Sequence, residues 1–79
     1  MTEAERIETF LRSLNPHQAE WADDTSLFEA RVLDSMHLAE LMAFLETEFR
    51  ISIQPHEVTP QNFDSLRALE AFVKRKKTP

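Results

Sequence analysis

The sequence has 79 residues, and its 14 aspartates and glutamates outnumber its 9 lysines and arginines, which gives a formal charge of -5. A chain of this length forms one small domain in which a deep catalytic cavity would compete with the core for side chains, so we expect no enzyme. It contains no cysteine and no glycine, which excludes disulfides, thiolate sites, P-loops and the Gly-rich turn of dinucleotide-binding folds.

The first predicted element is an amphipathic helix that begins near Thr2 and ends at Asn15-Pro16. Thr2 and Glu5 have the spacing of a capping box. Apolar residues then recur at the spacing of one helical face, at Ile7, Phe10, Leu11 and Leu14.

Residues 15–33 show little helical period and predict a long ordered loop. Its apolar anchors are expected to be Leu27, Phe28, Val32 and Leu33. Loops longer than about 12 to 15 residues are uncommon in compact domains and are often functional. The length of this loop therefore points to a function near it.

Asp34-Ser35 offers N-cap side chains to the strongest predicted helix, over residues 36–49. Its inward stripe is expected to consist of Leu38, Leu41, Leu45 and Phe49. The other positions mix small apolar residues with acidic ones, among them Met36, Ala39, Glu40, Ala43 and Glu46.

The rest of the chain predicts a linker and two further helices. Residues 50–54 are expected to be extended and to direct Ile51 and Ile53 into the core, and Thr59-Pro60 to begin a very short helix. Asp64-Ser65 caps the last helix, whose inward residues are Leu66, Leu69, Phe72 and Val73. A basic run follows, where the helix dipole favours cations, and is expected to be a frayed helix end: Lys74, Arg75, Lys76 and Lys77.

These elements predict an all-α fold, a small four-helix bundle with three long helices, one short helix and a long ordered loop between the first two. We expect a single domain over residues 1–79, with its core at about 3–75 and a tail at 76–79. Residues 1–73 contain all 14 acids and only five cations, a surface that repels nucleic acid and attracts basic proteins. The acidic first ten residues and the short apolar runs favour a cytoplasmic monomer without membrane contact.

Several residues have the types needed for catalysis or metal binding, but their spacing does not suit either. Asp34, Ser35 and His37 are the residue types of a hydrolase triad, yet neighbours one or two apart on a helix do not face each other. The three histidines, His17, His37 and His56, are scattered, and the pair His37 and Glu40 lacks further ligands, so we expect no metal site.

Ser35 can be interpreted in three ways. The first is an N-cap in a small helical protein-interaction module, the second is the nucleophile of a minimal hydrolase, and the third is an exposed hydroxyl that a modifying enzyme can reach. A phosphodiester at this position would lie near the positive end of the helix, which suits an anion.

The segment Val32-Leu33-Asp34-Ser35-Met36 resembles the Asp-Ser-Leu attachment motif of the acyl carrier protein superfamily. The resemblance continues in residues 41–49, 51–53, 57–58 and 63–66, and covers roughly residues 3–75. Asp64-Ser65-Leu66 also fits the motif. Ser35 is the expected attachment residue because it follows the long loop and opens the acidic helix, whereas Ser65 opens a helix with a basic end.

The resemblance implies a four-helix carrier without catalytic activity. A phosphopantetheinyl transferase would attach 4'-phosphopantetheine from coenzyme A to Ser35, between Asp34 and Met36, and the thiol of the arm would hold the cargo as a thioester. The positions that resemble partner-binding positions of carriers are Met36, Ala39, Glu40, Ala43 and Glu46. The other implied partners are a loading ligase and a downstream acyl-accepting enzyme.

Residues 27–36 look more like D-alanyl carriers and stand-alone aminoacyl carriers than fatty-acid carriers, and Thr47 stands where fatty-acid carriers often have an acid. The resemblance therefore favours an aminoacyl cargo, loaded by an amino acid:carrier protein ligase. Two further departures are Met36 in place of leucine and Ala30-Arg31-Val32 where many members have glycine. We expect the loop to turn here without a residue of positive φ.

Overall fold

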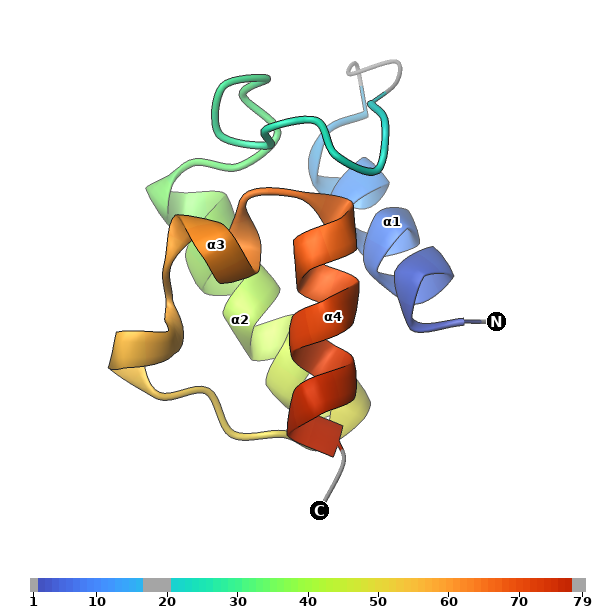
Figure 1. Ribbon diagram of the computed structural model, residues 1–79. Helices are drawn as coiled ribbons and strands as arrows, with labels where there is room; N and C mark the ends of the chain where they lie inside the picture. Colours follow the sequence, from blue (N-terminus) through green and yellow to red (C-terminus); the bar gives the residue numbers. More distant parts are fainter. Residues whose placement is uncertain (1, 17–20, 78–79) are drawn as a thin grey trace.

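The computed structural model describes residues 2–16 and 21–77, which form four α-helices and one short 3₁₀ helix (Figure 1). The bounds are Glu3–Leu14 for α1, Ser35–Phe49 for α2, Pro55–Glu57 for the 3₁₀ helix η1, Pro60–Phe63 for α3 and Leu66–Lys77 for α4. The described ranges contain no β-strand. The predicted all-α class, with three long helices and one short, is confirmed, and η1 is an element that the sequence did not predict.

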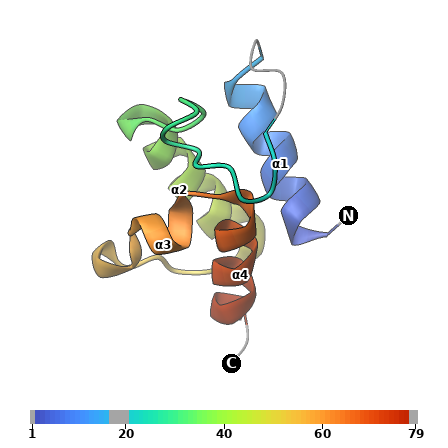
Figure 2. The ribbon, with the colours of Figure 1, turned by 45° about the horizontal axis from the view of Figure 1, so that its top comes forward.

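The helices pack around α4, which contacts α1, α2 and α3, while α1 also packs on α2 (Figures 1 and 2). Side chains from every α-helix meet in one apolar core. Its buried members are Ile7, Leu11, Leu27, Val32, Leu33, Leu41, Leu45, Phe49, Ile53, Phe63, Leu66, Leu69, Phe72 and Val73. Removing this apolar surface from water is the main force that holds the helices together.

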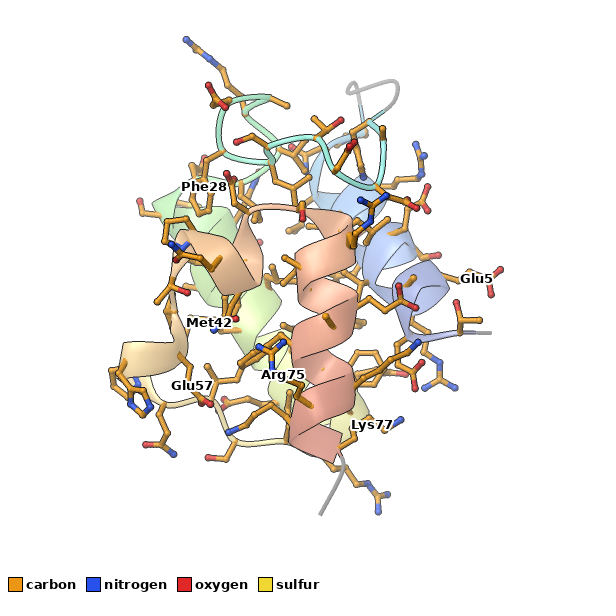
Figure 3. The ribbon with its side chains drawn as sticks, viewed as in Figure 1. Glu5, Phe28, Met42, Glu57, Arg75 and Lys77 are labelled. Atoms are coloured by element: carbon orange, nitrogen blue, oxygen red, sulfur yellow. The ribbon has the colours of Figure 1, made fainter. Side chains whose placement is uncertain are left out.

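Most of the predicted inward residues lie in this core, whereas Phe28 is exposed and four others are only partly buried: Phe10, Leu14, Leu38 and Ile51. Phe28 was expected to anchor the loop, but its side chain is 38% exposed. Its ring lies at the edge of a small hollow of about 100 Å³ that Leu38, Val58 and Phe63 also line. The prediction that Phe28 is a core anchor was therefore wrong, because the loop places it at the rim (Figure 3).

The long loop is ordered by hydrogen bonds to the junction between α3 and α4. The Asp64 carboxylate accepts hydrogen bonds from Ser26 Oγ at 2.7 Å and from the Phe28 N–H at 3.0 Å. The Leu27 N–H donates to the Asp64 carbonyl at 2.8 Å, and the Arg67 N–H donates to the Asp23 carbonyl at 2.9 Å. These hydrogen bonds hold the described part of the loop in place across one end of the bundle (Figure 2).

The loop turns into α2 through a residue with left-handed backbone geometry. Arg31 has φ 63°, and the N–H groups of Val32 and Leu33 both donate back to the Leu27 carbonyl, at 2.9 and 3.1 Å. The expectation of a turn without positive φ was therefore wrong. The tight reversal requires this conformation even though an arginine, with its Cβ, adopts it at a cost of about 1–2 kcal/mol.

The basic end of α4 is held by contacts within the chain. Lys76 binds both carboxylate oxygens of Glu57, at 3.0 and 3.1 Å, and Lys77 binds Glu3 at 2.9 Å. Lys74 contacts Glu70 at 3.2 Å, and Arg75 contacts Asn62 at 2.8 Å. Lys76 and Lys77, expected to belong to a frayed tail, are the last residues of α4, and residues 78–79 lie outside the described ranges.

Candidate functional site

The candidate site lies where the long loop enters α2. Asp34 is the N-cap of this helix, and its carboxylate accepts a hydrogen bond from the His37 backbone N–H at 2.8 Å. This hydrogen bond is the largest cause that holds the pKa of the Asp34 carboxyl below its ordinary value. The carboxylate therefore keeps its charge at neutral pH and satisfies one of the free N–H groups of the first turn.

Ser35 is the first residue of α2, and its side chain is exposed. Within residues 2–16 and 21–77 its hydroxyl forms no hydrogen bond, because Asp34 already supplies the cap. The interpretation of Ser35 as the helix cap was therefore wrong. The structure leaves its oxygen in solvent at the positive end of a 15-residue helix.

Ser65, the serine of the second Asp-Ser pair, has a different environment. It is only half exposed, and its Oγ accepts a hydrogen bond from the Ala68 N–H at 3.0 Å, as the sequence predicted for a cap of α4. Its neighbour Asp64 binds the loop. Both members of this pair thus have structural roles, which distinguishes them from Asp34 and Ser35.

The geometry around Ser35 contains neither a hydrolase triad nor a metal site. The imidazole Nδ1 of His37 lies 3.3 Å from the Val32 carbonyl oxygen, and Asp34 binds the His37 backbone rather than its ring. Among the residues that the structure describes, no three His, Asp or Glu side chains are grouped so that they could hold a metal ion. His17 lies outside the described residues.

The predicted partner-binding residues all lie on the exposed face of α2: Met36, Ala39, Glu40, Ala43 and Glu46. Met36 is 70% exposed, so its apolar side chain is available for contact at the start of this face. The Glu40 carboxylate has no hydrogen-bond or ion-pair partner in the described parts of the chain, so its charge faces solvent.

Glu46 also has a structural contact that the sequence did not predict. Its carboxylate accepts a hydrogen bond from the Ile53 backbone N–H at 2.9 Å. The chain reverses at Arg50, which has φ 56°, and this reversal brings residue 53 back alongside α2. No local sequence pattern specifies such a contact, because it depends on the direction in which the chain leaves the helix.

No family model matches the chain. Three curated proteins are similar to it over part of their length. A probable acyl carrier protein, PigG from Serratia sp., is 38% identical over 53 residues, which cover 67% of this chain and 61% of that protein. Aminoacyl carrier proteins 2 and 1 from Bradyrhizobium diazoefficiens are 39% and 44% identical over 49 and 41 residues.

The alignments cover 55% and 46% of the two Bradyrhizobium proteins, so the chain spans about half the length of these relatives. All three are named as carriers rather than enzymes. In the described part of the chain, no helix is long and apolar enough to span a membrane. The resemblance seen in the sequence is confirmed by these matches, which support membership of the acyl carrier protein family.

Proposed function

We propose that this chain is a carrier that holds an acyl or aminoacyl group as a thioester on a 4'-phosphopantetheine arm attached to Ser35. The proposal rests on the Ser35 hydroxyl, which is exposed and makes no hydrogen bond in the described ranges. Asp34 and Met36 flank it, one as the cap and one as an exposed apolar side chain.

The residues at the start of α2 fit a phosphodiester. The helix dipole, and the N–H groups of the first turn that Asp34 does not bind, favour an anion there. Asp34 fixes the beginning of the helix, so the serine oxygen has a defined position without being used in the cap. The bound group would supply the thiol for the thioester, which a chain without cysteine lacks.

An aminoacyl cargo is the form that we favour. Two of the three similar proteins described above are named aminoacyl carrier proteins. The hollow between the loop, α2 and α3 has a volume of only about 100 Å³, and the larger hollows, of about 480 and 540 Å³, lie between α1 and α2 and are open to solvent. A short polar cargo that stays in solvent needs no larger space. An amino acid:carrier protein ligase would load it, and an acyl-accepting enzyme would receive it.

The exposed face of α2 would meet these partners. Glu40 presents an unpaired charge that basic residues of a partner can approach, and Met36, Ala39 and Ala43 offer small apolar contacts. Glu46 would contribute less because Ile53 already uses its carboxylate. Charge pairing at such a rim gives fast and reversible association, which a cytoplasmic, monomeric carrier that visits several enzymes requires.

Attachment can be tested by the intact mass of the purified protein. The chain is incubated with coenzyme A, magnesium and a phosphopantetheinyl transferase of broad specificity, next to a carrier that the transferase is known to modify. We expect wild type and Ser65→Ala to gain one phosphopantetheine and Ser35→Ala to gain none while keeping its circular dichroism. An unmodified wild type would contradict the proposal and favour a protein-interaction module.

A further inference from the structure

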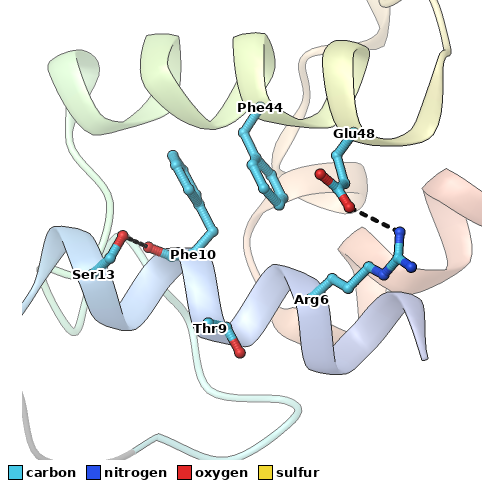
Figure 4. Close-up of a pocket in the computed structure, with 6 residues that line it drawn as sticks. All are labelled: Arg6, Thr9, Phe10, Ser13, Phe44 and Glu48. Atoms are coloured by element: carbon cyan, nitrogen blue, oxygen red, sulfur yellow. Dashed lines mark hydrogen bonds and ion pairs between the residues drawn. The ribbon is translucent and has the colours of Figure 1, made fainter. Parts of the chain in front are cut away.

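An aromatic pair lies between α1 and α2, on a part of the surface that does not include Ser35. The rings of Phe10 and Phe44 stack with centroids 4.3 Å apart and planes within 10° of parallel. Both side chains are only partly buried, although they pack against the core. Figure 4 shows the two rings extending from facing helices toward each other.

Two adjoining hollows lie on either side of this pair, and we call them together the α1–α2 groove. One has a volume of about 480 Å³ and extends toward Arg6 and Glu48. The other has a volume of about 540 Å³ and extends toward Glu40 and Ala43. The second hollow thus shares two residues with the predicted partner-binding face, and the groove continues that face toward α1.

The walls of the groove favour an apolar occupant. Its two hydroxyl-bearing side chains on α1 already donate to the backbone of their own helix. Thr9 donates to the Glu5 carbonyl at 2.9 Å, and Ser13 donates to the Phe10 carbonyl at 2.6 Å (Figure 4). These hydroxyl protons are therefore not available to a ligand. Thr47 of α2 adds a further hydroxyl to the second hollow, and the surface shared by both hollows is that of the Phe10 and Phe44 rings, whose burial favours a complex.

The uncompensated charge at the rim of the groove is acidic. The charged residues that line the two hollows are Arg6, Glu40 and Glu48. Arg6 pairs with Glu48 at 2.8 Å, and Arg12 pairs with Glu8 at 2.6 Å, so both cations are already compensated within the chain. Glu40 has no such pair in the described ranges. A second copy of this chain would bring like charges together, whereas a basic partner would complement the rim.

We infer that the α1–α2 groove is a docking surface for a protein segment that presents an aliphatic or aromatic side chain flanked by lysine or arginine. The apolar side chain covers the Phe10–Phe44 pair, and the cations approach Glu40. Phosphopantetheine plays no part in these contacts, so the inference is independent of the attachment at Ser35.

Nuclear magnetic resonance of the full ¹⁵N-labelled chain tests this inference with three synthetic peptides. The first is an amphipathic helix of leucine and lysine, the second replaces lysine by glutamate, and the third replaces leucine by serine. We expect the leucine–lysine peptide alone to shift amide signals, and to shift them along the groove in both α1 and α2. Shifts confined to the loop and α3, or equal shifts with the serine–lysine peptide, would overturn the inference.

Two matched variants locate the contact. Ala43→Arg places a long cation at the groove from an exposed position, and Ala71→Arg makes the same change on an exposed position of α4. Ala43→Arg should weaken peptide binding at least tenfold and Ala71→Arg should leave it unchanged. Equal affinities of the two variants for the peptide would contradict the inference. Amide signals that shift with the concentration of the protein alone, without peptide, would also contradict it, because they would identify a second copy as the occupant.

Glu40→Gln keeps the shape of the side chain and removes its charge, so it provides a test if Ala43→Arg perturbs folding. Its binding should weaken at low salt and approach that of wild type at high salt, where charges are screened. The titrations are repeated with Ser35→Ala, which should bind as wild type does. Failure of peptide binding therefore leaves the mass measurement unaffected, and the two proposals can fail separately.

Discussion

Replacing Ser35 and Ser65 by alanine, one at a time, should affect folding stability very differently. Ser65→Ala removes the acceptor of the Ala68 N–H in a half-buried position, and loss of an N-cap costs about 1 kcal/mol. For a domain of this size that loss lowers the midpoint of thermal unfolding by about 4–8 °C. Ser35→Ala removes no hydrogen bond in the described ranges and leaves the Asp34 cap intact, so its effect should stay within about 0.5 kcal/mol.

Urea and thermal unfolding followed by circular dichroism measure both effects. Ser65→Asp is the matched control, since an aspartate also caps helices and should keep the stability close to that of wild type. A loss at Ser35 as large as that at Ser65 would refute the reasoning, because it would mean that the Ser35 hydroxyl supports the helix. If Ser65→Ala were as stable as wild type, the reasoning would also be refuted, because the hydrogen bond from the Ala68 N–H to Ser65 would then not stabilise α4.

Three further predictions concern the loop and the ionic contacts. Arg31→Gly should raise the free energy of unfolding by about 0.5–1 kcal/mol, because glycine adopts positive φ without strain, whereas Arg31→Ala should not. Asp64→Ala removes two hydrogen bonds from the loop and should cost about 2 kcal/mol and speed amide exchange at Phe28, with Asp64→Asn less affected. The hydrogen bond from the Gln54 N–H, and after it the one from Lys76, hold the pKa of the Glu57 carboxyl below its ordinary value. The ionised Glu57 therefore contributes fully to the free energy of unfolding above about pH 4.3, and this contribution is lost as the pH falls through the lower pKa of the folded state. Unfolding midpoints against pH should be flatter in Glu57→Gln than in wild type, and an identical profile would contradict this assignment.

Local patterns were sufficient to predict most of the fold. The capping box at Thr2 and Glu5 and the inward stripes of the three long helices are properties of neighbouring residues. The structure confirms the capping box and most of the inward residues, while Phe10, Leu14 and Leu38 are only partly buried. Asp34-Ser35 was correctly placed at the start of the second long helix. The sequence did not show which of the two would be the cap, because both side chains can accept the same hydrogen bond.

The features that the sequence did not predict depend on residues far apart in the chain. Lys76 reaches Glu57 across 19 positions, which turns an expected frayed end into part of the bundle. Phe28 lies at the rim because Asp64, 36 positions away, holds its backbone. The positive φ of Arg31 follows from hydrogen bonds that close the loop, and a residue with a Cβ gives no sign of it.

Because Asp34 caps α2 and Ser35 does not, a chemical change at the Ser35 hydroxyl need not disturb the start of the helix. Asp34 caps the first turn of α2, and the Ser35 hydroxyl takes no part in the cap. Attaching a group to Ser35, or removing it, would therefore leave the cap hydrogen bond between Asp34 and His37 in place. If Ser35 bears the proposed group, α2 would therefore present the same face to partner enzymes in the loaded and the unloaded state.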